Sequence, residues 1–187
     1  MKETITWLLS IERLAGAFYS EVSVGFKEDK EFSKFFRHLS GEEALHARAM
    51  EKASHYLVRH AAPAFSISVD EETKNKIEIP FVKNRELLSA GHFSRENVMD
   101  CLATTEFSEW NDIFLYVIKS LKEDRELMPV VAKMHEHLRE IIQFMETVPE
   151  GRKHLYIIKS LPQVWKENIL IIDDDQPILE FLKRLLE

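Results

Sequence analysis

Cysteine is almost absent from this chain, which has one, Cys101, in 187 residues. A single cysteine excludes an intramolecular disulfide and any zinc or rubredoxin-type iron site that needs several thiolates from one chain. Glycine and proline are also scarce, with 5 and 6 residues, while hydrophobic residues make up 45%. This composition favours a packed, mostly helical protein over a disordered or all-β one.

Basic runs and long apolar runs are missing as well. The formal net charge is −7 and Lys and Arg do not cluster, so we expect neither nucleic acid nor a membrane as a partner. No apolar run approaches the ~18 residues that a membrane-spanning helix needs. Near the N-terminus, Glu12 and Arg13 interrupt what would otherwise resemble a signal-peptide core. We therefore expect a cytoplasmic protein.

What the chain does have is helical periodicity. Apolar side chains recur at alternating three- and four-residue steps, the pattern of an amphipathic helix. The predicted helices span about 3–27, 31–60, 94–123 and 124–148. Ser94 is a predicted N-cap. In the long connection between the second and third helices we expect short helices broken at Pro80.

The arrangement of these segments predicts an all-α four-helix bundle. A narrow apolar seam on each helix suits nearly antiparallel packing at about 20°. The turns KEDKEF (27–32) and KEDREL (122–127) occupy the same place in each half of the chain. We therefore expect two similar helical hairpins joined by a long crossover connection.

Polar side chains with metal-binding chemistry interrupt the apolar seams. In the motif EEALH, Glu43 and His46 are three residues apart and so lie on one face of a helix. The full set on the seams is Glu12, Glu43, His46, Glu106, Glu109 and His137. His135, on a neighbouring stripe, is the alternative to His137.

Four carboxylates in a helical core need compensation, because a buried, unpaired charge costs several kcal/mol. Protonation, buried water or a bound cation would supply it. A pair of metal ions matches the mixed carboxylate and imidazole donors, and Glu43 is placed to bridge two ions. The competing interpretation is that Glu43 and His46 are a polar pair on a solvated face.

These motifs resemble those of the rubrerythrin-like branch of the ferritin-like di-iron carboxylate proteins. The resemblance rests on Glu12 followed by Tyr19, on EEALH and on EFSEW, and it covers residues 1–148. It implies a ferritin-like four-helix bundle that holds two iron ions on the six seam residues. It also implies that Tyr19 hydrogen-bonds a ligand carboxylate from the opposite half of the bundle.

The chain departs from that family at two positions. Met134 stands where the fourth helix would carry a second bridging glutamate, and a thioether is a poor ligand for hard ferric iron. Manganese, zinc or a single metal ion are therefore alternatives to two iron ions. The second tyrosine of the family, eight residues after Glu106, is replaced by Phe114, with Tyr116 close by as the candidate for its role.

The resemblance implies a redox protein that reduces or senses O2 or peroxide. Because the chain has no CxxC pairs of the rubredoxin type, reduction would require an external electron donor. We expect a homodimer. The alternative function is a helical sensory or dimerisation module of a signalling protein, without catalytic turnover.

The last twenty residues carry a different pattern. A predicted buried strand, Ile169–Ile172, is followed by three aspartates and an amphipathic helix that starts near Pro177. This segment, 168–187, resembles the start of a response-regulator receiver domain, with 149–167 as a partly packed connector.

The receiver resemblance implies a role for two of these aspartates. Asp173 and Asp174 would help to bind Mg²⁺ in a complete receiver, whose phosphate donor would be a histidine kinase. We expect either a piece of a longer protein or a vestigial fusion, because the phosphate-accepting aspartate would lie on a later strand.

Overall fold

The computed structural model describes residues 1–59, 68–120 and 128–160, and every regular element in these ranges is an α-helix. The helices are α1 (Lys2–Gly25), α2 (Lys30–Arg59), α3 (Glu71–Ser89), α4 (Arg95–Glu106), α5 (Glu109–Ser120), α6 (Met128–Thr147) and α7 (Pro149–Ser160). The predicted all-α class is thus confirmed for the described residues. The receiver-like segment, 168–187, lies outside them.

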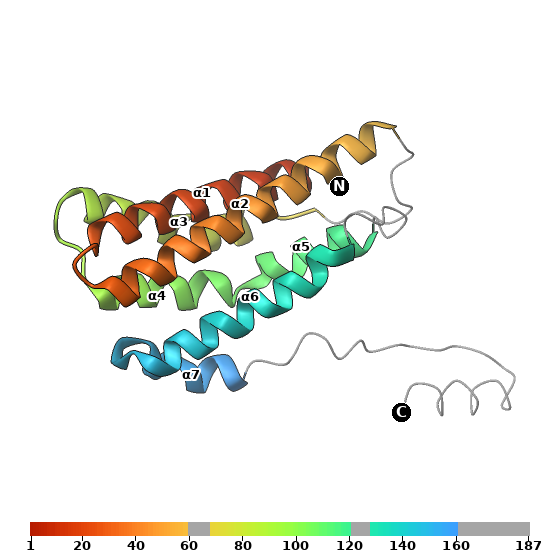
Figure 1. Cartoon of the computed structure of the whole chain (residues 1–187). Coiled ribbons are helices and arrows are strands. Elements are labelled where there is room, and N and C mark those ends of the chain that lie inside the picture. The colour runs from red at the N-terminus through yellow and green to blue at the C-terminus, as the bar shows by residue number, and fades with distance from the viewer. Residues whose placement is uncertain (60–67, 121–127, 161–187) are drawn as a thin grey trace, which may run out of the picture.

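The long helices pack side by side around one core. Figure 1 shows α1 and α2 as an antiparallel pair, with α4, α5 and α6 along one side of it. α2 contacts α6, and α1 contacts α5. α3 packs against α1 and α4, and α7 packs against α4 and α6. None of the described helices combines the length and hydropathy needed to cross a bilayer.

The predicted break at Pro80 is wrong, because α3 continues through it from Glu71 to Ser89. Proline removes one backbone donor from a helix interior. Burial offsets this loss: Ile77 and Phe81, on either side of the proline, are 1% and 0% exposed. The helix begins at an effective cap, since Asp70 accepts a hydrogen bond of 2.7 Å from the Thr73 backbone amide.

The predicted third helix is not continuous, because α4 ends at Glu106 and α5 begins at Glu109. Polar side chains around the break compete for backbone groups. The Ser108 hydroxyl donates to the Thr105 carbonyl at 2.6 Å. The Asn111 side-chain amide donates to the Glu106 carbonyl at 2.5 Å. This carbonyl therefore does not need a backbone amide of the next turn as its hydrogen-bond partner. The predicted N-cap Ser94 is confirmed, as part of a capping box with Asn97.

Aromatic side chains hold α2 against α6. The rings of Phe35 and Phe144 are stacked, with centroids 3.7 Å apart and an interplanar angle of 10°. Phe32 and Phe36 also contact Phe144, at centroid distances of 5.8 and 6.2 Å. Such pairs contribute about 0.5–1.5 kcal/mol each beyond the burial of their area. This packing sets the register in which polar residues of α2 and α6 face each other.

Gly151, near the start of α7, lies against the backbone of Met145 in α6. A Cβ atom added to Gly151 would lie 2.7 Å from both the Cα and the carbonyl oxygen of Met145. Backbone atoms cannot move aside as a flexible side chain can. We therefore expect Gly151→Ala to lower the free energy of unfolding by about 1–3 kcal/mol, measured by urea denaturation.

Gly41, inside α2, is the matched control for this variant. A Cβ atom added to Gly41 meets nothing within 4 Å. Because glycine weakens a helix interior, Gly41→Ala is expected to raise the free energy of unfolding by about 0.5–1 kcal/mol. Equal effects of the two substitutions would contradict the close approach at Gly151.

Candidate metal centre

Residues from four helices form a buried polar group in the core. They are Glu12 of α1, Glu43 and His46 of α2, Glu106 at the end of α4, and His137 of α6. Their exposed fractions are between 0% and 3%. These five residues are therefore core residues, and the alternative of a polar pair on a solvated face is wrong for Glu43 and His46.

One half of the group lies between α1 and α2. His46 Nδ1 is 3.0 Å from Glu43 Oε2 and 3.4 Å from Glu12 Oε2. Gly16 of α1 permits this approach of the two helices, because a Cβ atom there would lie 3.2 Å from the Cβ of Glu43. One ligand atom from each of the three side chains lies within 4.8 Å of the others.

The other half lies between α2, α4 and α6. His137 Nε2 is 3.2 Å from Glu106 Oε2 and 3.5 Å from Glu43 Oε1. Here too, one ligand atom from each of the three residues lies within 4.8 Å of the others. Glu43 thus belongs to both halves, with one carboxylate oxygen toward His46 and the other toward His137. A carboxylate in this position could contact an ion in each half.

Several oxygens of the group have no hydrogen-bond donor among the described residues. They are both carboxylate oxygens of Glu12 and Oε1 of Glu43, all fully buried. Glu12 Oε2 has only the long ionic contact to His46. A buried polar atom without a partner costs about 1–3 kcal/mol. Atoms of this kind are available to a cation.

Protons balance part of the charge in the absence of a metal. Burial raises the pKa of Glu12 well above its usual value, although His46 opposes the shift. Burial also opposes ionisation of Glu43, but His46 and His137 outweigh it and lower the pKa of Glu43 to about 2. For His46, burial is outweighed by Glu43 and Glu12, so its pKa rises to about 10. Glu43 is therefore anionic and His46 cationic at neutral pH.

Two residues outside this group orient its members. Glu42 accepts a hydrogen bond of 2.8 Å from His137 Nδ1 when that nitrogen is protonated, which leaves Nε2 facing Glu43 and Glu106. Carboxylates in this position commonly fix the ring of a metal-binding histidine. The sequence analysis did not select Glu42. Its position next to Glu43 and four residues after His38 was the available signal.

Tyr19 is the second orienting residue, and its hydroxyl donates a short hydrogen bond to Glu106 Oε1. This joins α1 to the end of α4, as the family resemblance implied. Burial, and then the nearby carboxylates of Glu106 and Glu43, raise the pKa of Tyr19 well above its usual value. The hydroxyl therefore remains a donor throughout the neutral range.

Removing this donor should destabilise the metal-free protein. Tyr19→Phe leaves a buried carboxylate oxygen without its hydrogen bond, so we expect the free energy of unfolding to fall by about 1–3 kcal/mol. Urea denaturation measures the change. Tyr156→Phe is the control, because Tyr156 is 84% exposed and should lose almost nothing. Equal stability of the two variants would contradict a structural role for the Tyr19 hydroxyl.

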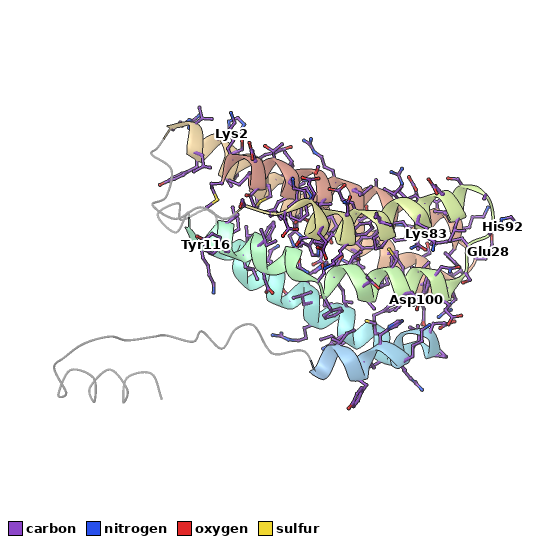
Figure 2. All side chains as sticks on the ribbon, turned by 180° about the vertical axis from the view of Figure 1, so that it is seen from behind. Lys2, Glu28, Lys83, His92, Asp100 and Tyr116 are labelled. Atoms are coloured by element: carbon purple, nitrogen blue, oxygen red, sulfur yellow. The ribbon has the colours of Figure 1, made fainter. Side chains whose placement is uncertain are left out.

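The structure does not bring Tyr116 into the group. Its side chain is 36% exposed, and Figure 2 shows it at an outer edge of α5. Tyr116 is two residues beyond Phe114, and two residues turn a helix by about 200°. Phe114 is the residue that faces inward, with its ring centroid 5.4 Å from that of His46.

Other predicted residues lie partly or wholly outside the described set. Glu109 is the first residue of α5, but its side chain is not among those described, and the same holds for His135. Asp173 and Asp174 lie outside the described residues altogether. Met134 is fully buried, one turn before His137. Among the described side chains of α6, His137 is the one that contacts the buried group.

The helical protein thus contains buried clusters of Glu and His side chains with the donor types and spacing of a metal site. Polar contacts of Glu42 and Tyr19 hold two of these side chains in place. Comparisons of the chain with protein-family models, curated proteins and solved structures find no match.

Proposed function

We propose that the buried group is a dinuclear metal centre in which Glu43 bridges the two ions. The observation that carries this proposal is the position of Glu43, whose two oxygens face His46 and His137. Fully buried carboxylate oxygens without donors fit the same interpretation, because a cation in each half of the group would give them a partner. Glu12 and His46 would hold one ion, and Glu106 and His137 the other.

The donors favour iron, with manganese and zinc as competitors. Carboxylate oxygen and imidazole nitrogen suit these ions, whereas soft ions prefer the thiolates that this site lacks. When bound, a pair of iron ions would supply one-electron redox chemistry toward O2 or peroxide. The protein's own part is to exclude water and to orient its carboxylates through Tyr19 and Glu42.

The proposed family is the rubrerythrin-like branch of the ferritin-like di-iron carboxylate proteins, as the motifs of residues 1–148 imply. In that assignment α1, α2, the broken α4–α5 helix and α6 are the four helices of the bundle, and α3 belongs to the long crossover. Met134 makes the half of the site on α6 poorer in carboxylates. Glu109 is the proposed replacement.

Reduction or sensing of O2 or peroxide is the activity that this centre would support. Reduction would draw on an external electron donor, and sensing would act on the receiver-like segment 168–187. We expect the protein to work as a homodimer. The alternative is a signalling bundle without turnover, and it is favoured by one observation: His46 lies within ion-pair distance of both Glu43 and Glu12, so a protonated His46 would balance part of their charge without a metal.

Metal analysis of protein purified without oxygen tests the proposal. The expected result is two metal ions per chain and, for the iron form, an absorption spectrum that changes on addition of peroxide. Protein that binds no metal would overturn the proposal.

Steady-state assays with an artificial reductant then distinguish an enzyme from a sensor. An enzyme turns over many times, whereas a sensor reacts once each time it is reduced.

A further inference from the structure

A second His and carboxylate cluster lies beside the buried centre, at the surface of α2 and α6. His38 Nε2 is 2.8 Å from Glu140 Oε2 and 3.5 Å from Glu42 Oε2. Each of these residues offers one ligand atom, and the three atoms lie within 4.8 Å of one another. We call this cluster the outer triad.

The outer triad is open to solvent, whereas the buried centre is closed. The side chains of His38, Glu42 and Glu140 are 53%, 18% and 37% exposed. Those of Glu43, His46 and His137 are between 1% and 4% exposed. A hydrated cation can therefore reach the triad directly but cannot reach the buried ligands without passing a layer of protein.

Glu42 links the two clusters through one oxygen atom. Its Oε2 is 3.5 Å from His38 and 2.8 Å from His137 Nδ1. Glu42 precedes Glu43 in α2, and Glu140 is three residues, about 4.5 Å along the helix axis, beyond His137 in α6.

We propose that His38, Glu42 and Glu140 form an outer divalent-cation site through which the buried centre is loaded. The donors are one imidazole and two carboxylates, the same mixture that the buried halves offer, so the same ions suit both sites. A cation held at the triad lies within one helical turn of the buried ligands on both helices. The loading step rests on the proposed function of the buried centre.

Two measurements on the full chain test the outer site. The first follows Mn²⁺ binding by the EPR signal of the free ion. The second follows Co²⁺ loading of the buried centre by stopped-flow absorption. The signal of the buried centre is identified as the one that is absent from Glu43→Gln.

The test variant carries two substitutions, His38→Ala and Glu140→Gln. The control is His55→Ala with Glu136→Gln, which changes exposed residues of the same types on the same helices.

The test variant should bind Mn²⁺ more weakly at its outer site by at least about tenfold, since even the loss of outer partners weakens metal sites by 10- to 100-fold. It should also load Co²⁺ at least about tenfold more slowly, with the same final spectrum as wild type. The control should match wild type in both measurements.

Two other results would overturn the proposal, and they are distinguishable. If both double variants match wild type in Mn²⁺ affinity or in loading rate, the triad only pairs α2 with α6, and the buried centre stands. If wild type shows no Co²⁺ signal that depends on Glu43, the proposed function fails and the loading step fails with it.

Discussion

Replacing Glu43 by glutamine should remove both ions of the proposed metal centre, lowering the metal content from about two per chain to nearly none. Each half of the buried group depends on this carboxylate, because one oxygen lies 3.0 Å from His46 Nδ1 and the other 3.5 Å from His137 Nε2. Glutamine keeps the size of the side chain but has lost the charge and one oxygen donor. Even outer partners of a metal contribute 10- to 100-fold in affinity, so a bridging ligand should contribute more. Metal content and binding isotherms measure the effect.

Two further substitutions make this result specific. Glu12→Gln should remove only the ion between α1 and α2, since Glu12 belongs to one half of the group. Glu51→Gln should leave the metal content unchanged, because Glu51 is a partly exposed glutamate of α2 that pairs with Arg13. Full metal content in Glu43→Gln, or equal losses in all three variants, would count against a bridged centre.

Metal affinity should rise steeply with pH, which is the second large effect that we expect. Metal ions bind the neutral imidazole, so binding must displace the proton that His46 carries. Glu43 and Glu12, working against burial, raise the pKa of His46 from 6.5 to about 10. Between these pH values, the apparent affinity should increase about tenfold per pH unit for each proton displaced.

Titrations with a buffered metal at several pH values, together with counts of the protons released, measure this effect. His137, whose pKa is raised mainly by Glu43 and Glu106 against the effect of burial, should contribute a second proton. An affinity that does not change from pH 6.5 to pH 9 would mean that metal binding does not displace these protons. The binding site would then lie elsewhere in the chain.

The pKa shifts of His46 and Glu43 make the stability of the metal-free protein depend on pH in opposite directions. The pKa of His46 is higher in the folded protein, so its contribution to stability is complete below pH 6.5 and is lost as the pH rises through about 10. The pKa of Glu43 is lower in the folded protein, so its contribution is present above pH 4.5 and is lost as the pH falls toward 2. Bound metal should therefore stabilise the fold most at alkaline pH.

Much of the helical structure and of the buried group was predictable from the sequence. The periodicity of apolar residues predicted α1 and α2 to within two residues at their ends. It also predicted that Glu12, Glu43, His46, Glu106 and His137 face inward, since each keeps step with apolar neighbours on its own helix. This inference works because the direction of a side chain follows from the helix repeat alone.

Other features depend on burial and on side-chain hydrogen bonds that the apolar pattern does not reveal. Burial of Ile77 and Phe81 carries α3 through Pro80, and the hydrogen bond from Asn111 to the Glu106 carbonyl accompanies the break between α4 and α5. Local patterns predicted the opposite in both places. Helix propensities differ by up to about 0.7 kcal/mol among ordinary residues and by about 3 kcal/mol for proline, so packing and side-chain hydrogen bonds can override them.

The sequence by itself therefore determined which residues point into the core and which chemical groups they carry there. Only the tertiary structure decided how those groups meet: that Glu43 faces both histidines, that Glu42 connects His137 to a surface triad, and that Tyr19 binds Glu106 across the core. The physical reason is that helix periodicity fixes a direction. The distance between two side chains on different helices depends on the register that packing imposes, here through contacts such as the stack of Phe35 on Phe144.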